Sequence, residues 1–125
     1  MKKILVAEDD KFLSSAYRVK LTKAGFEVQI ASDGNEALNL LKTFTPDLIL
    51  LDLMMPIKDG FATLQEIKAN PIWQHIPVIV ASNLGQKEDT EKTMKLGAKD
   101  FVIKSDLSLD ELIKKINLII DEKQQ

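Results

Sequence analysis

Charged side chains directly follow three short apolar runs of the sequence. The runs are residues 4–7, Leu48–Leu51 and residues 101–103, and the charged residues behind them are Glu8-Asp9-Asp10, Asp52 and Lys104. In an open parallel sheet, the carboxyl ends of the strands border the crevice in which ligands bind. We therefore expect a carboxylate cluster, a single carboxylate and an ammonium group to share one site.

The acidic cluster predicts a site for a hard divalent cation. Carboxylates held within a few ångströms of one another repel, and their protonation is favoured unless a cation relieves the repulsion. Mg²⁺ is usually bound by one or two carboxylates together with water and phosphoryl oxygens. The chain has no cysteine and one histidine, His75, which argues against a softer metal. Acidic residues also favour a helix N-terminus, but Asp52 on a neighbouring strand favours the metal site.

Lys104 and Ser82 supply groups that suit a phosphoryl ligand. An ammonium close to Asp52 would neutralise charge on a phosphoryl oxygen, whereas the same lysine at an isolated strand end would simply be exposed. Ser82 ends the apolar run Val78–Ser82. Its hydroxyl either donates to a phosphoryl oxygen or caps the helix that follows, and both roles can hold in different states.

The elements that must position these residues alternate along the chain. Short apolar runs predict strands, and segments of helical period separate them, which is the pattern of a doubly wound α/β sheet. The predicted strands are residues 4–7, Glu27–Ala31, Leu48–Leu51, Val78–Ser82 and Asp100–Ile103. Ser108 and Glu111 form a capping-box pattern at the start of the last helix.

The predicted fourth helix, residues 87–96, differs from the others in composition. It is nearly all polar and leaves mainly Met94 and Leu96 to bury. Because helices in proteins are stabilised mostly by packing of an apolar face, we expect this helix to be the least firmly held. On composition alone, it is an ordinary solvated surface helix.

Length and composition predict one soluble domain spanning residues 1–125. The chain has 45% hydrophobic and 29% charged residues and a formal net charge of −2. This net charge gives no case for nucleic-acid binding, which would need a basic face. The first apolar run is too short for a signal peptide, and no run approaches the about 20 residues that cross a bilayer. We expect a cytoplasmic protein with no membrane partner and no direct nucleic-acid partner.

The set of site residues resembles the receiver domain of bacterial two-component response regulators, in particular the stand-alone, chemotaxis-regulator type. The set covers essentially the whole chain, in order, and consists of Glu8-Asp9, Asp52 followed by Met55-Pro56 and Asp59-Gly60, Ser82 and Lys104. The resemblance implies a (βα)5 flavodoxin-like fold with strand order 2-1-3-4-5. It also implies a phosphorylation-dependent signalling switch rather than a turnover enzyme.

The resemblance assigns roles to the residues of the acidic site. A sensor histidine kinase or a histidine phosphotransfer protein would donate a phosphoryl group to Asp52 within a phosphorelay, forming an aspartyl phosphate. Mg²⁺ would be bound by Asp9, Asp52 and the backbone carbonyl of Met54, with Glu8 contributing through water. Asp10 would lie just outside this metal site.

Three further residues would respond to the phosphoryl group. Lys104 would pair with it, Ser82 would bond it after transfer, and Phe101, at the position of the family's switch aromatic, would turn inward. A downstream protein would dock on the face formed by the fourth helix, the fifth strand and the fifth helix. On that face we expect four exposed lysines: Lys92, Lys95, Lys99 and Lys115. A phosphorylation-linked dimer is a further expectation.

Two features bear on how closely the chain follows the family. Ser105 stands where the family usually has a proline in a cis peptide, and a cis bond before serine would cost about 2.5–4 kcal/mol. The Lys104-Ser105 bond is therefore either strained or trans.

In this family, the residues two past the phosphoacceptor and two past the hydroxyl residue line the approach of water, and here they are Met54 and Leu84. Because neither can orient a water molecule, we expect slow spontaneous dephosphorylation.

Three other functions fit the sequence less well. A haloacid-dehalogenase-type phosphohydrolase also uses an aspartate at a strand end with Mg²⁺, but Met54 stands where its second aspartate would be, and the chain lacks room for a cap domain. A dinucleotide site would need Gly-x-Gly-x-x-Gly after the first strand, and none is present. A third alternative is an interaction module that keeps the fold without being phosphorylated. The full set of site residues argues against it, and Ser105 is the one residue that favours it. Output is expected through contact with a partner, unless the chain belongs to a longer protein.

Overall fold

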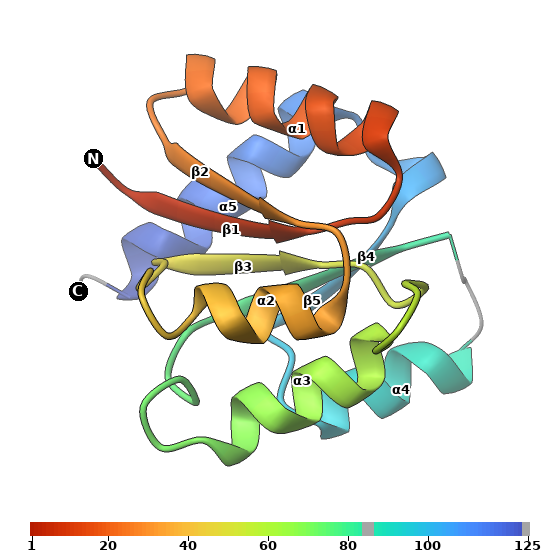
Figure 1. Cartoon of the computed structure of the whole chain (residues 1–125). Helices are drawn as coiled ribbons and strands as arrows, with labels where there is room; N and C mark the ends of the chain where they lie inside the picture. Colours follow the sequence, from red (N-terminus) through yellow and green to blue (C-terminus); the bar gives the residue numbers. More distant parts are fainter. Residues whose placement is uncertain (84–86, 124–125) are drawn as a thin grey trace.

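The protein, described here from a computed structural model, folds around a parallel β-sheet (Figure 1). The structure describes residues 1–83 and 87–123, and within them five strands pair in the order β2-β1-β3-β4-β5. The strands are β1 (Lys3–Ala7), β2 (Glu27–Ala31), β3 (Leu48–Leu51), β4 (Val78–Ser82) and β5 (Asp100–Ile103). The predicted fold class and strand order are confirmed, and β1 begins one residue earlier than expected.

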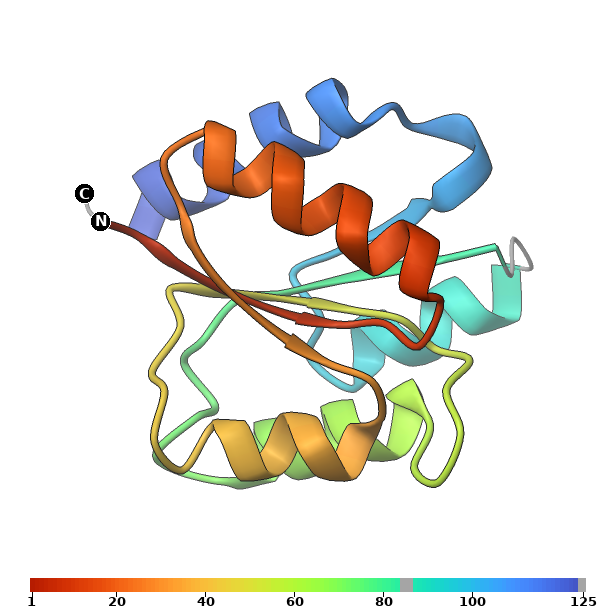
Figure 2. The same ribbon diagram turned by 45° about the horizontal axis from the view of Figure 1, so that its top comes forward.

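Helices cover both faces of the sheet. On one face lie α1 (Lys11–Lys23) and α5 (Leu109–Lys123), and on the other lie α2 (Gly34–Leu40), α3 (Gly60–Ala69) and α4 (Lys87–Lys95), as Figure 2 shows. A short 3₁₀ turn, η1 (Lys104–Asp106), connects β5 to α5. No helix among the described residues has the length and apolar character needed to cross a membrane.

The central strands are buried on both faces, and their side chains alternate between two hydrophobic clusters. Ile4 and Val6 belong to the cluster under α1 and α5, whereas Leu5 and Ala7 belong to the cluster under α2 and α3. Successive residues of a strand point to opposite faces. A strand that is covered on both sides therefore needs apolar residues at every position, which is why these strands are unbroken apolar runs.

Side-chain caps fix where the helices begin. Asp10, Asp33 and Asp59 each accept a hydrogen bond from a backbone N–H in the first turn of α1, α2 and α3, which satisfies a donor that the helix itself leaves unpaired. The predicted capping box of α5 is confirmed. The N–H of Glu111 donates to Ser108 Oγ at 3.1 Å, and the N–H of Ser108 donates to Glu111 Oε1 at 3.3 Å.

The weak apolar face predicted for α4 is present, but the prediction of which residues it buries is partly wrong. Within α4, all of whose residues are described, Thr93 alone is buried, and Met94 is 44% exposed. Leu96, just beyond the helix, is half-buried against the core as expected. Thr93 is tolerated in the interior because its hydroxyl donates to the carbonyl of Thr90 at 2.9 Å.

Gly60, the first residue of α3, allows this helix to start directly against the end of β3. A Cβ atom built on Gly60 would overlap the carbonyl oxygen of Asp52 and would lie 2.6 Å from the Cα atom of Leu53. Both are backbone atoms, so the clash cannot be relieved by a rotamer change. The Gly60→Ala variant should therefore lose about 2–4 kcal/mol of unfolding free energy, measured by urea denaturation.

The Gly25→Ala variant is the control for Gly60→Ala in this measurement. Gly25 has φ of 95° with open space around its Cβ position, so this variant meets backbone strain without a steric clash and should lose only about 1–2 kcal/mol. Equal losses in the two variants would contradict the close approach of α3 to β3.

Candidate functional site

The ends of β1, β3, β4 and β5 converge on a pocket of about 300 Å³. Its lining residues are Glu8, Asp9, Asp10, Asp52, Met54, Ser82, Asn83 and Lys104. The structure thus brings together the predicted carboxylates, the lysine and the serine. Asn83 is an additional polar residue of the pocket that was not predicted, although it directly follows Ser82 at a strand end.

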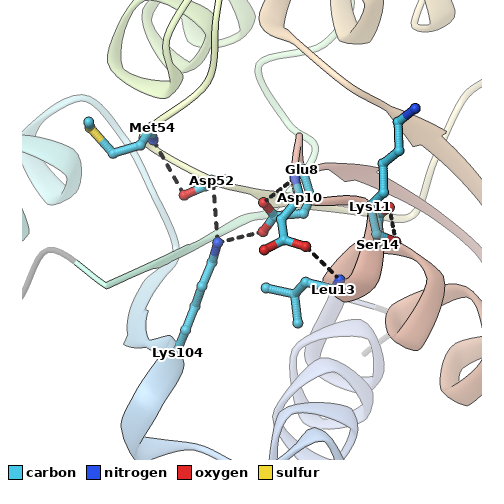
Figure 3. Close-up of polar contacts among 8 residues, drawn as sticks. All are labelled: Glu8, Asp10, Lys11, Leu13, Ser14, Asp52, Met54 and Lys104. Carbon is cyan, nitrogen blue, oxygen red and sulfur yellow. Dashed lines mark hydrogen bonds and ion pairs between the residues drawn. The ribbon is translucent and has the colours of Figure 1, made fainter.

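Lys104 is the centre of the contacts in this pocket (Figure 3). Its Nζ atom lies 2.5 Å from Glu8 Oε1 and 3.2 Å from Asp52 Oδ2. Glu8 and Asp52 are only 3% and 6% exposed, so both carboxylates are almost removed from water. A buried carboxylate needs a partner of opposite charge, and the single ammonium of Lys104 serves both.

Backbone N–H groups hold the two carboxylates in place. The N–H of Asp10 donates to Glu8 Oε2 at 3.1 Å, and the N–H of Met54 donates to Asp52 Oδ1 at 3.3 Å. Both contacts are drawn in Figure 3. Each carboxylate therefore has one oxygen on Lys104 and the other on a backbone donor, which fixes its orientation.

Burial raises the pKa of the Glu8 carboxyl from 4.5 to about 7, and the charge of Asp52 adds to this rise against the opposing effect of Lys104. Burial alone would lower the pKa of Lys104, but its hydrogen bond to Glu8 and the negative charge of Asp52 outweigh burial and raise it. The lysine is therefore held in its charged form. The pocket retains an excess of negative charge that a further cation would relieve.

Three of the acidic residues form a group that suits a metal ion. Glu8, Asp9 and Asp52 each offer one carboxylate oxygen, and these oxygens lie within 4.8 Å of one another. Asp9 is exposed, so the group opens to solvent on one side. A set of hard oxygen donors with an open side fits Mg²⁺ or Mn²⁺ and does not fit a soft metal.

Asp10 has a structural part in this region. Its side chain accepts a hydrogen bond from the N–H of Leu13 at 3.1 Å and caps α1. This contact agrees with the expectation that Asp10 lies just outside the acidic group. The cap also places the first turn of α1 beside the pocket (Figure 3).

The loop between β3 and α3 borders the pocket and is tightly folded. The N–H of Gly60 donates to the carbonyl of Leu53 at 2.9 Å, and the N–H of Lys58 donates to the carbonyl of Pro56 at 2.7 Å. The latter contact closes a turn around Ile57, which has φ of 69°. Positive φ is strained for a β-branched residue, and such strain costs about 1–3 kcal/mol.

The remaining predicted site residues have different surroundings. Ser82 is completely buried, and the side chain of Met54 is 62% exposed. Phe101 is partly buried against the cluster under α2 and α3. The peptide bond between Lys104 and Ser105 is trans, as are the other described bonds, so Lys104 reaches both carboxylates without the strained alternative. Leu84 lies outside the described residues.

The predicted lysine surface needs one correction. Lys92, Lys95 and Lys99 are exposed as expected. Lys115 is half-buried, because its Nζ atom lies 2.6 Å from Asp100 Oδ2 on the neighbouring strand. This ion pair ties α5 to β5. The pair could not be predicted from the sequence, because a lysine on a helix and an aspartate on a strand have no fixed spacing.

Comparison with known proteins places the chain in a family. It matches the response regulator receiver domain over residues 4–117. It is 37% identical over 102 residues to the probable transcriptional regulator ycf27 of Guillardia theta, covering 82% of this chain and 39% of that protein. It is 36% identical over 128 residues to the response regulator PleD of Caulobacter vibrioides, covering 98% of this chain and 28% of that protein. The chain spans less than half the length of either relative.

Solved structures agree with this assignment. The receiver domain of the Francisella response regulator 1452 is 35% identical, with a TM-score of 0.91 and coverage of 98% of this chain and 99% of that one. The Mn²⁺-bound form of response regulator Rcp1 is 34% identical, with a TM-score of 0.82 and coverage of 95% and 91%. The chain therefore belongs to the family of response regulator receiver domains, signalling domains that accept a phosphoryl group on an aspartate and switch a surface for a partner.

Proposed function

We propose that Asp52 is the phosphoacceptor of this domain and that residues 1–125 form a single receiver domain. The observation that carries the proposal is the position of Asp52 at the end of β3, 3.2 Å from Lys104 and grouped with Glu8 and Asp9. A carboxylate nucleophile, an ammonium and a cation site are what phosphoryl transfer asks of a protein, since catalysis of this reaction is mainly positioning and charge neutralisation.

The transfer step follows from this arrangement. A carboxylate oxygen of Asp52 attacks the phosphorus atom of a phosphohistidine, the new P–O bond forms as the P–N bond breaks, and the imidazole leaves. Lys104 lies beside Asp52 and offsets the charge on the phosphoryl oxygens. The donor is a sensor histidine kinase or a histidine phosphotransfer protein, and the domain acts as a switch rather than as a turnover enzyme.

A magnesium ion fits the acidic group as the cofactor. Asp9, Asp52 and the backbone carbonyl of Met54 would bind it directly. Glu8 would contribute through water, because one of its oxygens is held by Lys104 and the other by the N–H of Asp10. When bound, the ion neutralises negative charge on the phosphoryl group during transfer. The Mn²⁺-bound form of Rcp1 supports a divalent cation in a domain of this family.

Ser82 and Phe101 are proposed as the residues that read the phosphorylation state. Ser82 lines the pocket next to Asp52, and its hydroxyl would bond a phosphoryl oxygen after transfer. Phe101 lies on β5, three residues before Lys104, and would turn further inward when Ser82 moves. The surface formed by α4, β5 and α5 would then dock a downstream protein or a second copy of the domain.

The cellular context is a further part of the proposal. The protein would act in the cytoplasm, where histidine kinases present their phosphoryl groups, and the domain itself would bind neither membrane nor nucleic acid. The relative ycf27 is a probable transcriptional regulator, and it is longer than this chain. A regulator of that kind would reach DNA through residues beyond its receiver domain.

Phosphorylation by a small donor tests the phosphoacceptor. Incubation with Mg²⁺ and acetyl phosphate should add the mass of one phosphoryl group to the wild-type protein and nothing to the Asp52→Asn variant, as measured by intact-mass spectrometry. The matched control is Asp121→Asn on the exposed side of α5, which should be phosphorylated like the wild type. Full labelling of Asp52→Asn would overturn the assignment, and continuous release of phosphate would indicate a hydrolase instead.

The raised pKa of Glu8 makes the metal-free protein sensitive to pH. Below pH 4.5 the carboxyl is protonated in both the folded and the unfolded chain, and between pH 4.5 and about 7 the unfolded chain ionises first. The unfolding free energy should therefore fall as the pH rises through this window. Urea denaturation in EDTA should show a smaller fall for Glu8→Gln than for the wild type, and Mg²⁺ should restore stability to the wild type at pH 8.

The exposed Glu27 on β2 provides the control for this measurement. The Glu27→Gln variant should keep the wild-type pH profile. Identical profiles for the wild type and for Glu8→Gln would contradict the account of the pocket as a site of uncompensated negative charge.

The exposed side chain of Met54 predicts a slow loss of the phosphoryl group. Met54 lines the pocket and offers no group to orient an attacking water molecule. The Met54→Asn variant should dephosphorylate about tenfold faster, which corresponds to about 1.4 kcal/mol of the barrier. Decay of the radiolabelled protein measures the rate, with Met94→Asn on α4 as the control. An unchanged decay rate in Met54→Asn would exclude a role for this position.

A further inference from the structure

An apolar cavity lies behind the acidic pocket, on the face of the sheet that α1 and α5 cover. Its volume is about 280 Å³. Its apolar lining comes from α1, β4, β5, α5 and the segment before α5: Leu13, Tyr17, Ala81, Val102, Leu107, Leu109 and Leu112. The same residues belong to or pack against the hydrophobic cluster under these two helices. Leu13, Leu107 and Leu109 are only partly buried, so the cavity lies at the edge of this cluster and opens to solvent on one side. Figure 2 shows α1 and α5 side by side above the sheet at this place.

The cavity differs from the larger hollows of the surface. The hollow between α2 and α3 is lined by the Lys58–Glu66 ion pair, and that beside α5 by the Lys99–Glu122 ion pair. Both are more open to solvent than the cavity under α1 and α5. The latter carries one charged residue in its wall, Lys104, whose ammonium is already held by Glu8 and Asp52. An occupant of this cavity therefore needs no charge.

Tyr17 gives the cavity a hydroxyl group that has no hydrogen-bond partner among the described residues. The side chain is 4% exposed, and no hydrogen bond to its hydroxyl is found among the described residues. Burial raises the pKa of this hydroxyl, with the negative charges of Glu8 and Asp52 adding to the effect. The hydroxyl therefore stays protonated and available as a donor. Because no buried side-chain oxygen or nitrogen of the described residues lacks a partner, the Tyr17 hydroxyl is in contact with solvent, and a ligand with an acceptor atom would take the place of water there.

We propose that this cavity is a binding site for a small, uncharged, mostly apolar ring compound that carries one hydrogen-bond acceptor for Tyr17. A cavity of about 150 Å³ lined by apolar side chains admits a single benzene ring, so the larger volume found here has room for two fused rings. The stem of Lys104 forms part of the wall. The ligand therefore contacts the residue that holds the acidic pocket together.

Quinoline is a suitable probe, because it has two fused rings and one acceptor nitrogen and is uncharged at pH 7.5. Added to the wild-type protein, it should raise the thermal unfolding midpoint in a saturable way. It should also shift the amide resonances of Leu13, Tyr17, Lys104 and Leu112 in heteronuclear NMR spectra. The absence of a saturable rise up to the solubility of quinoline would overturn the proposal. The result does not depend on phosphorylation of Asp52, so the two proposals can fail separately.

Two variants test the location of the site. Ala81→Leu fills the cavity from β4 and should keep the midpoint of the wild type without quinoline while abolishing the response to quinoline. The matched variant Ala31→Leu adds the same group at a fully buried alanine of the opposite cluster. That variant should lower the midpoint by about 5 °C or more. An equal drop in both variants, or a full response to quinoline in Ala81→Leu, would refute the cavity as the binding site.

Tyr17→Phe tests the hydrogen bond that the Tyr17 hydroxyl donates to the acceptor atom of the ligand. Removing the hydroxyl should weaken quinoline binding severalfold and leave the binding of naphthalene, which has no acceptor, unchanged. Equal affinity of quinoline for the wild type and for Tyr17→Phe would overturn the part assigned to this residue.

Discussion

The contact of one ammonium with two buried carboxylates governs the architecture of this domain. Glu8 and Asp52 are almost fully buried, and Lys104 is the cation between them. The strand register puts Ala7 beside Leu51 and, through Val80, puts Leu51 level with Phe101. Lys104 therefore begins two residues further along the sheet than Asp52, and its side chain spans the difference to contact both carboxylates. The residue that directly follows each of β1, β3 and β5 thus carries a charge into the same space.

The same contact lowers the stability of the fold in order to keep charged groups in the pocket. A core of this size is stable without charged groups in its interior, and replacing buried charges by apolar residues often stabilises a protein. The acidic pocket buries two carboxylates beside a single ammonium. Burial, with the negative charge of Asp52 adding to it, raises the pKa of Glu8. A pocket with this excess of negative charge favours a divalent cation, so an unfavourable contribution to the stability of the free protein would become binding energy for a metal ion.

Much of the fold was predictable from sequence because the central strands are covered on both faces. Their unbroken apolar runs and the charged residues that end them are local signals. The charged residues at the strand ends predicted the acidic pocket, and the resemblance of the whole set to receiver domains predicted the strand order. Other features depend on contacts between distant elements. Met94 was expected to be buried, but a nearly all-polar helix has no periodicity that identifies its inner face, and Thr93 lies inside instead. The Lys115–Asp100 pair and the cavity beside Tyr17 arise from how α1 and α5 pack, which no local pattern encodes.

The contacts of α4 have a consequence for how such a domain can change over time. The helix buries one threonine and is joined to α3 by Lys92, whose Nζ atom lies 4.2 Å from the centre of the Phe61 ring. Most of its side chains could be replaced without removing apolar surface from the core, so substitutions there cost little folding free energy. New surface chemistry can therefore be acquired on this helix one residue at a time, while the sheet and the acidic pocket stay as they are.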